Sequence, residues 1–181
     1  MSDAGTYVLD SVMLTQEAIQ RRVSEVAALI RSDYSGEEIV LTGVLKGAAI
    51  FMSDLARSIG PDVDVIMDFI AVSSYGDSST SSGVVKMVKD MDTYAEDKNL
   101  ILVEDIMDTG LTLSYLREMF SARAPRSFKT CVLLEKPERK KVDCVIDYKG
   151  FTIPDKFVVG YGLDYAGKWR HLPDIWCVTQ R

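Results

Sequence analysis

Histidine is the scarcest chemically useful side chain in this sequence, because His171 is the only one among 181 residues. A single histidine excludes a metal centre built from several histidines and gives little support to a Ser-His-Asp hydrolase. Cysteine is also scarce, and the three cysteines, Cys131, Cys144 and Cys177, show no C-x-x-C spacing. We therefore expect no disulfide framework, and reduced cysteines typical of a cytoplasmic protein.

The sequence also has no long apolar run and no excess of positive charge. No run approaches the ~20 residues that a membrane span needs, and the N-terminus shows no basic segment followed by an apolar one. The formal net charge of −6 argues against a nucleic-acid-binding surface. We interpret the local basic cluster of Arg139, Lys140 and Lys141 as a solvated turn. These features predict a soluble cytoplasmic protein with no membrane or nucleic-acid partner.

The order of apolar patterns predicts an α/β protein. A chain of 181 residues that is 47% hydrophobic is long enough for one domain with a sizeable core. Helical periodicity and strand-like runs alternate through the middle of the chain. We expect helices at 15–32, with Thr15 as the cap, at 48–59 and at 113–120. We expect strands at 38–43, 62–72, 100–103, 128–134, 144–147, 157–161 and 175–179.

These elements predict a mostly parallel central sheet flanked by helices. The C-terminal region contains Pro154, Gly160, Gly162 and Pro173 among strand-like stretches, which predicts a small irregular lobe over the sheet edge. We expect one domain over residues 1–181, whose hood lobe combines N- and C-terminal segments. In the segment 73–82, seven of ten residues are serine or threonine, so we expect a loop there.

The stretch from Leu100 to Leu113, LILVEDIMDTGLTL, carries the strongest functional signal. Its first four residues are continuously apolar, as in a strand covered on both faces, and Glu104 and Asp105 follow where we expect the strand to end. Asp108 and small residues then form a turn before a helix. Ligands of open parallel sheets bind at the carboxyl ends of strands, and a helix start offers free N–H groups to a phosphate.

The chemistry of this stretch favours a sugar phosphate as the ligand. Adjacent carboxylates can hold ribose hydroxyls or the water shell of a magnesium ion, and small residues let backbone amides approach a phosphate. The acids alone, Glu-Asp-x-x-Asp, fit equally well a strand end with solvated carboxylates followed by a helix cap. The length of the whole pattern favours the binding site.

The pattern resembles the PRPP-binding signature of type I phosphoribosyltransferases: four apolar residues, two acids, two apolar residues and Asp-Thr-Gly-x-Thr. Other segments resemble the members of this family that act on hypoxanthine and guanine. These segments are Leu45-Lys46-Gly47, Ser74-Tyr75-Gly76, Lys136 after a strand, IPDKFVVGYGLD from Ile153 to Asp164, and Arg170. Each residue alone could occupy an ordinary surface or core position, and Lys46 alone is more typical of a surface lysine, so the joint spacing from about Val40 onward carries the resemblance.

The resemblance implies transfer of the ribose 5-phosphate group from PRPP to a 6-oxopurine. The products are a nucleoside monophosphate, IMP or GMP, and pyrophosphate, as in purine salvage. Asp108 is the implied general base, and Mg²⁺ is the implied cofactor, with Glu104, Asp105 and Asp164 as its ligands. The residues implied in substrate binding are Lys46, Gly47, Ser74, Tyr75, Glu104, Asp105, Thr109, Gly110, Leu111, Thr112, Lys136, Phe157, Val158, Asp164 and Arg170. The family also implies a homodimer or homotetramer.

The resemblance divides the residues on the sugar side by role. The segment 108–112 holds the 5′-phosphate, and Glu104 and Asp105 hold the ribose hydroxyls. Lys46 and Arg170 offset the charge of the leaving pyrophosphate, which would leave bound to magnesium. The same likeness implies that the Leu45–Lys46 peptide bond is cis.

On the base side, the resemblance implies that Lys136 donates a hydrogen bond to the purine O6. Phe157 stacks on the purine ring, and the backbone at Val158 and Asp164 reads its edge. The segment with Ser74 and Tyr75 is implied to be a flexible lid that excludes water from the reacting centre.

Two positions depart from the family pattern, since Ala48 stands where a second glycine occurs and Leu111 where some members have lysine. They affect only how tightly the diphosphate end is held. Two alternatives remain open. One is another type I phosphoribosyltransferase that uses xanthine, adenine or a pyrimidine, although Lys136 disfavours adenine. The other is a regulator that keeps the fold as a nucleotide sensor and binds nucleic acid, which the acidic balance and Asp108 disfavour.

Overall fold

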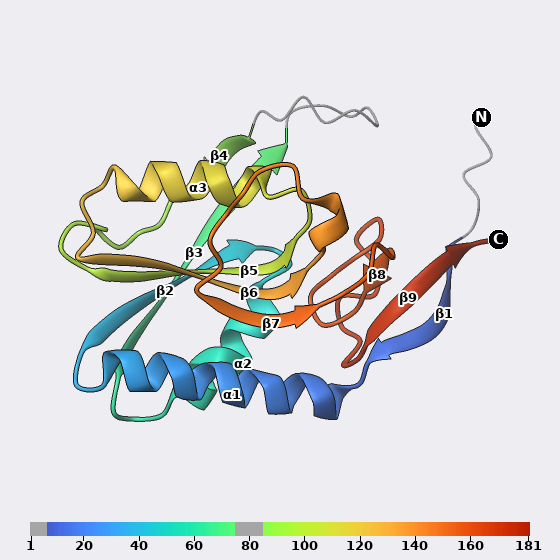
Figure 1. Cartoon of the computed structure of the whole chain (residues 1–181), viewed down its shortest axis with the longest axis horizontal. Coiled ribbons are helices and arrows are strands. Elements are labelled where there is room, and N and C mark those ends of the chain that lie inside the picture. The colour runs from blue at the N-terminus through green and yellow to red at the C-terminus, as the bar shows by residue number, and fades with distance from the viewer. Residues whose placement is uncertain (1–6, 75–84) are drawn as a thin grey trace.

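The computed structural model describes residues 7–74 and 85–181, and its strands and helices follow the order shown in Figure 1. In chain order the elements are β1 (Tyr7–Leu14), α1 (Gln16–Tyr34), β2 (Glu38–Leu45), α2 (Ala49–Ile59), β3 (Asp64–Ser74), β4 (Val85–Lys89), β5 (Asn99–Met107), α3 (Leu111–Ser121), β6 (Ser127–Glu135), the 3₁₀ helix η1 (Pro137–Arg139), β7 (Tyr148–Thr152), β8 (Val158–Val159) and β9 (Ile175–Gln180).

Six strands form one sheet in the order β4-β3-β2-β5-β6-β7. All neighbouring strands in it are parallel except β3 and β4, which run antiparallel. Figure 1 shows α3 on one face of this sheet and α1 and α2 on the other. The predicted α/β fold with a mostly parallel central sheet flanked by helices is confirmed.

The position of β5 in the sheet explains why the run Leu100–Val103 is continuously apolar. Leu100 and Leu102 pack into the core beneath α3, whereas Ile101 and Val103 pack into the core beneath α1 and α2. Successive side chains of a strand point to opposite faces of the sheet, so a strand covered on both faces needs apolar residues at every position. All four side chains are buried.

Helix α1 begins where the sequence predicts it. The Thr15 hydroxyl accepts a hydrogen bond from the Ala18 N–H at 3.3 Å and so caps the helix. The residues of α1 that are buried recur at helical spacing: Ile19, Val23, Val26, Ala27, Ile30 and Tyr34. The helix ends at Tyr34, two residues later than predicted. In the part of the chain that the structure describes, none of the helices has the length and apolar character needed to cross a membrane.

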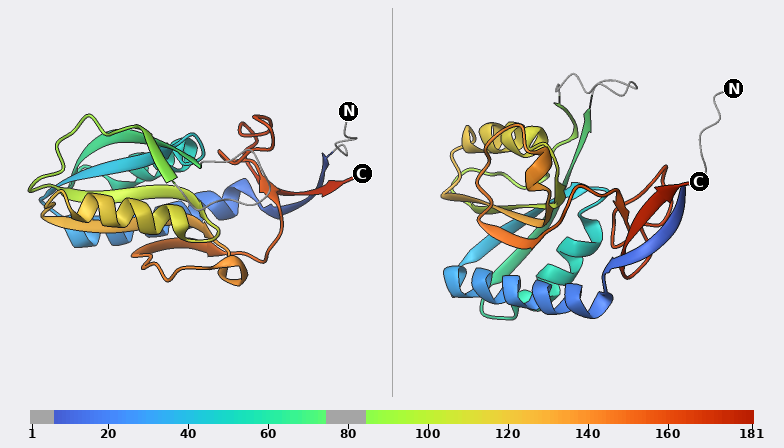
Figure 2. Two further views of the ribbon diagram at one scale, coloured as in Figure 1. Left: turned by 90° about the horizontal axis from the view of Figure 1, so that it is seen from above. Right: turned by 45° about the vertical axis from the view of Figure 1, so that its right-hand side comes forward.

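A second sheet joins the two ends of the described chain. Its order is β1-β9-β8, and β1 runs antiparallel to β9, with Tyr7 opposite Gln180. Both views in Figure 2 place this sheet beside the large one, beyond the carboxyl ends of its central strands. Val158 and Ile175 of the small sheet belong to the same buried cluster as Ile19 of α1.

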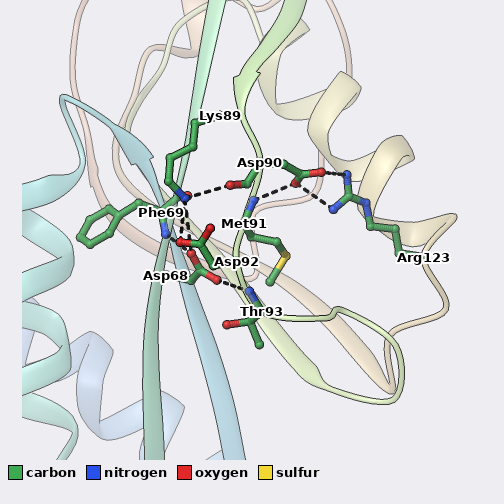
Figure 3. A network of polar contacts seen from close by, with 8 residues as sticks. All are labelled: Asp68, Phe69, Lys89, Asp90, Met91, Asp92, Thr93 and Arg123. Atoms are coloured by element: carbon green, nitrogen blue, oxygen red, sulfur yellow. Dashed lines mark hydrogen bonds and ion pairs between the residues drawn. The ribbon is translucent and has the colours of Figure 1, made fainter.

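A network of hydrogen bonds and ion pairs links residues 90–93, which follow β4, to β3 and to Arg123 (Figure 3). The buried Asp68 carboxylate accepts hydrogen bonds from the backbone N–H groups of Phe69 and Thr93, each at 2.7 Å. Burial opposes the ionisation of Asp68, but these hydrogen bonds outweigh it and lower its pKa. Arg123 at the end of α3 donates two hydrogen bonds to Asp90, each at 2.8 Å. The network therefore connects β3, the segment after β4 and α3.

Three segments differ from the prediction. No strand was expected at Tyr7–Leu14 or at Val85–Lys89, yet these are β1 and β4. The strand predicted at 144–147 is wrong, because the sheet pairing of β6 is made by Tyr148–Thr152 instead. One backbone hydrogen bond, from the Asp147 N–H to the Thr130 carbonyl at 3.0 Å, and side-chain hydrogen bonds hold the segment 144–147 in place of a ladder. The Thr130 N–H donates to the Asp147 carboxylate at 2.8 Å, and the Thr130 hydroxyl donates to the carbonyl of Val145 at 2.7 Å.

The cap of α1 can be tested by substitution. Thr15→Ala should lower the free energy of unfolding by about 1 kcal/mol, because the Ala18 N–H loses its acceptor. Thr15→Ser keeps the hydroxyl and should retain most of the stability. Urea unfolding followed by circular dichroism measures both variants against the wild type. An alanine variant as stable as the serine variant would show that the cap contributes nothing.

Candidate active site

The site lies where strands β2 and β5 separate. They pair as far as Gly43 opposite Val103, after which β5 continues beside β6 to Met107. The predicted end of the strand at Glu104 and Asp105 is therefore wrong, since both residues lie inside β5. What ends there is the pairing with β2. The crevice between parting strands is the usual binding position in an open parallel sheet.

Glu104 and Asp105 lie on β5 where the two strands part, and burial disfavours the ionised form of both carboxyl groups. Burial raises the pKa of Glu104 to about 8, and the charge of Asp105 adds to the shift. Burial also raises the pKa of Asp105 to about 6, although the Ile106 N–H donates a hydrogen bond to it at 2.9 Å. The Glu104 Oε2 atom is buried and has no hydrogen-bond partner among the described residues. A buried carboxylate oxygen without a partner is expected where a ligand completes the site.

The turn between β2 and α2 packs directly on Asp105. The Leu45–Lys46 peptide bond is cis, as the resemblance implied. A Cβ atom built on Gly47 would lie 1.6 Å from Asp105 Oδ2, so only glycine fits at this position. The Lys46 side chain is exposed and lines neither of the two cavities described below.

The turn that follows β8 packs on Gly47 from the other side. Gly162 has a φ of 100°, and a Cβ atom there would lie 2.0 Å from the Gly47 carbonyl oxygen. Arg170 Nη2 pairs with Asp164 Oδ1 at 2.5 Å, and Arg170 Nη1 donates to the Gly162 carbonyl at 2.5 Å. The charges of both Arg170 and Asp164 act on Asp105. The structure therefore brings three sequence-predicted site residues, Asp105, Asp164 and Arg170, together.

A small cavity of about 70 Å³ opens at the N-terminus of α3. Gly110 precedes the helix with a φ of 82°, which glycine adopts without strain, and no side chain caps the helix. The residues that line the cavity are Glu104, Ile106, Met107, Asp108, Thr109, Gly110, Thr112 and Leu113. The predicted Leu111 lies beside it, and its N–H donates to the Thr109 hydroxyl at 3.4 Å. This combination of helix start, hydroxyls and glycine is suited to a phosphate.

A larger cavity of about 440 Å³ lies on the other side of Asp108. The residues that line it are Asp105, Ile106, Asp108, Lys136, Arg139, Asp155, Phe157, Val158, Leu163 and Asp164. Its volume falls in the range of ~300–1,000 Å³ that is usual for small-molecule sites. Lys136 is 7% exposed, whereas Phe157 is 47% exposed. The four residues predicted on the base side, Lys136, Phe157, Val158 and Asp164, therefore share one cavity.

The predicted site residues did not include four that line this cavity: the charged Arg139 and Asp155 and the apolar Ile106 and Leu163. Arg139 Nε pairs with Asp108 Oδ1 at 2.5 Å, and its Nη1 pairs with Asp155 Oδ2 at 3.5 Å. Asp155 also pairs with Lys136 Nζ at 3.5 Å. The interpretation of Arg139 as part of a solvated turn is incomplete: Arg139 is exposed at the end of η1, but its guanidinium also bridges two carboxylates of the site. The only available signal was position: Asp155 lies within the segment IPDKFVVGYGLD, and Arg139 follows Lys136 by three residues.

Comparison with known proteins agrees with this geometry. The phosphoribosyl transferase domain matches residues 12–166 of the chain. This match covers most of the chain, including the crevice, both cavities and Asp164.

The chain belongs to the phosphoribosyltransferase family.

Relatives with high similarity carry a narrower name. The hypoxanthine-guanine phosphoribosyltransferase of Bacillus subtilis is 48% identical over 167 residues, which cover 92% of each chain. That of Aquifex aeolicus is 49% identical over 168 residues, 92% of this chain and 93% of the other. A crystal structure of a hypoxanthine-guanine phosphoribosyltransferase from Bacillus anthracis superimposes with a TM-score of 0.89 at 45% identity. It covers 97% of this chain and 100% of that one, and it holds a HEPES molecule in its active site.

The predicted lid of this phosphoribosyltransferase falls largely outside the description. Tyr75 and Gly76 lie outside the described residues. Ser73 and Ser74 belong to β3, where they lie opposite Lys86 and Val85 of β4. Ser73 and Ser74 therefore lie in a strand and not in the loop that was predicted to include them.

Glu104 and Asp105 suit a magnesium ion that takes only one or two ligands from the protein. Glu104, Asp105 and Asp164 do not form a three-ligand cluster, and no such group occurs within residues 7–74 and 85–181. Asp164 is instead held by Arg170 and by the Gly167 N–H at 2.6 Å. Mg²⁺ characteristically takes one or two carboxylates and completes its shell with water and substrate phosphates. The buried, unpartnered Glu104 oxygen beside Asp105 suits an ion held in that form.

The raised pKa of Glu104 predicts how the stability of the ligand-free protein depends on pH. The folded state favours the protonated carboxyl, so its contribution to stability is fully present below the usual pKa of 4.5 and is lost as the pH rises through about 8. Glu104→Gln keeps the shape and removes this titration. Compared with the wild type, the variant should therefore gain stability between about pH 5 and pH 8.

Urea unfolding across this pH range measures the difference. Glu118→Gln, on the exposed face of α3, is the matched control and should follow the wild type at every pH. Parallel pH profiles for the wild type and Glu104→Gln would contradict the buried, proton-bound state of Glu104.

Proposed function

We propose that this phosphoribosyltransferase transfers the 5-phosphoribosyl group of PRPP to the 6-oxopurines hypoxanthine and guanine, forming IMP or GMP and pyrophosphate in purine salvage. One observation carries the proposal: Asp108 lines both cavities. The smaller cavity has the chemistry of a phosphate site, and the larger one has a buried cation and an aromatic ring suited to a base. A group between the two can act on a base while the sugar phosphate is held beside it.

The small cavity would hold the 5′-phosphate. Thr109 and Thr112 offer hydroxyls there, and the first turn of α3 offers N–H groups and the positive end of the helix dipole. Gly110 supports this role because a Cβ atom at this position would lie 2.8 Å from the Val142 carbonyl oxygen. The backbone of the cradle is therefore packed against the segment that follows η1, which keeps its N–H groups in place.

Glu104 and Asp105 would hold the ribose hydroxyls together with Mg²⁺. The ion, when bound, neutralises charge on the pyrophosphate as the bond to the sugar breaks. Asp164 lies near enough to Asp105 for their charges to interact, and it would contribute through water. Arg170 is already positioned by Asp164 and Gly162, and it would offset the charge of the leaving group together with Lys46.

The larger cavity would hold the purine. Lys136 extends a buried ammonium group into it, which can donate a hydrogen bond to O6. The half-exposed Phe157 ring offers a face for stacking, and the backbone of Val158 and Asp164 would read the base edge. Asp108 would then accept the N7 proton of the purine while the opposite ring nitrogen bonds to the sugar.

We also propose that residues 1–181 form one domain, that the hood lobe consists of the β1-β9-β8 sheet, and that the enzyme is a cytoplasmic homodimer or homotetramer. The shared core of the two sheets supports a single domain. The free cysteines Cys131, Cys144 and Cys177 support a reducing compartment. Sedimentation at several protein concentrations measures the oligomeric state.

The activity is tested by pyrophosphate release from PRPP and Mg²⁺ with hypoxanthine, guanine, xanthine, adenine and uracil in turn. Release with hypoxanthine and guanine is expected. Release with adenine or uracil only would contradict the proposed base class, and no release with any base would contradict the transfer reaction.

Asp108→Asn should lower kcat by about a hundredfold or more, because it removes the proton acceptor and keeps a similar shape. The KM for PRPP should change much less. Asp143→Asn is the control, since Asp143 is fully exposed and pairs only with Lys140 among the described residues. A variant that keeps the wild-type kcat, measured where chemistry limits the rate, would exclude Asp108 as the base.

Lys136 should make the enzyme prefer 6-oxopurines to adenine. An ammonium group can only donate, and the exocyclic amino group of adenine also presents donors. A polar group left unpaired in a buried site costs about 1–3 kcal/mol, so discrimination should be at least about tenfold in kcat/KM. Lys136→Ala should narrow this gap mainly by slowing hypoxanthine and guanine. If the relative efficiencies of the three bases stay the same, Lys136 does not read the base.

A further inference from the structure

Arg139 makes contacts that the proposed chemistry does not use. It is the last residue of η1, and its guanidinium bridges Asp108, which follows β5, and Asp155, which precedes β8. The charges of Asp108 and then Asp155 raise the pKa of Arg139 further above its already high value, so the guanidinium remains charged. The Arg139 guanidinium therefore forms an ion pair with Asp108, the carboxylate that would act as the base.

The contact covers one oxygen of Asp108. The side chain of Asp108 is 41% exposed, yet its Oδ1 atom is buried and lies 2.5 Å from Arg139 Nε. Arg139, Asp108 and Asp155 all line the larger cavity, together with Phe157. The guanidinium thus lies on the cavity wall where a purine would present its N7–H group to Asp108.

We propose that Arg139 and the purine compete for Asp108, so that the guanidinium leaves the carboxylate when the base binds. The proposal rests on the proposed function. Arginine and the N7–H group are both donors, and they need the same acceptor. Moving the N7 proton onto the carboxylate would also leave the guanidinium without its charged partner, so the ion pair breaks before the proton moves.

Asp155 offers the Arg139 guanidinium an alternative ion-pair partner. It already pairs with Arg139 Nη1 at 3.5 Å, and its side chain is 40% exposed. When Lys136 turns from Asp155 toward the purine O6, Asp155 loses a cation that the withdrawn Arg139 replaces. Base binding therefore exchanges partners among four charged groups, two cations and two carboxylates, and leaves both Asp108 and Asp155 with a donor.

Breaking the Arg139–Asp108 pair should change the KM for the base only modestly, since half-exposed ion pairs contribute little free energy. Arg139→Gln removes the competing charge and should lower the KM for hypoxanthine by about two- to fivefold at saturating PRPP. In the wild type, added salt should lower the same KM by screening the Arg139–Asp108 pair, and the variant should lose this salt dependence. Arg139→Lys keeps the charge but cannot bridge both carboxylates as a fork, so its KM should lie between the two.

Lys140→Gln is the matched control. Lys140 follows Arg139 directly, carries the same charge and pairs with Asp143 outside the cavity. This variant should keep the wild-type KM for hypoxanthine and its salt dependence. A merely structural role of Arg139 would lower kcat or raise the KM for PRPP, whereas competition acts on the KM for the base.

Two results separate the competition from the proposed function. If the wild type releases pyrophosphate with hypoxanthine and Arg139→Gln shows an equal or higher KM for it, the competition is wrong and the function stands. If the wild type shows no transfer, the function is wrong, and titration calorimetry with hypoxanthine, which still carries the N7–H group, decides the competition. Tighter binding of hypoxanthine by Arg139→Gln than by the wild type and Lys140→Gln supports it, and equal or weaker binding overturns it.

Discussion

The contact of Gly47 with the Asp105 carboxylate is the constraint on which the rest of the site depends. A Cβ atom at Gly47 would overlap Asp105, and one at Gly162 would overlap the Gly47 carbonyl. Three segments therefore pack closely: the Asp105 carboxylate near the end of β5 lies against Gly47 in the turn after β2, and the Gly47 carbonyl lies against Gly162 in the turn after β8. Because neither glycine has a side chain, this dense packing brings Asp105 and the turn after β8 close to each other.

The carboxylates of the site differ in how their charges are compensated: some are buried without a cation, and others form ion pairs. Glu104 and Asp105 have raised pKa values because burial penalises their charge. Elsewhere in the site, carboxylates face cations, as in the pairs of Asp108 with Arg139 and of Asp164 with Arg170. In the function that we propose, the two buried acids take ribose hydroxyls and a cation, and the paired carboxylates exchange hydrogen-bond partners.

Much of the fold could be predicted because its causes are local. The cap at Thr15 and the apolar spacing of α1 act within a few residues of one another, and the helix forms where they predict it. The apolar run of β5 reports burial on both faces, which holds in the structure. The prediction failed at 144–147, where hydrogen bonds from Thr130 replace strand pairing. A β-rich pattern cannot distinguish a segment in a ladder from one held by a distant side chain.

The sequence by itself determined the chemistry present at the site, since the signature from Leu100 to Leu113 combines a buried strand, paired acids and a helix start in one continuous stretch. Tertiary structure decided which charges meet. Arg139 and Asp155 are separated from Asp108 along the chain, and only the arrangement of η1 and the segment before β8 over the end of β5 brings the three together. Ion pairs depend on the distance between charges in space, and local patterns of sequence carry no record of that distance.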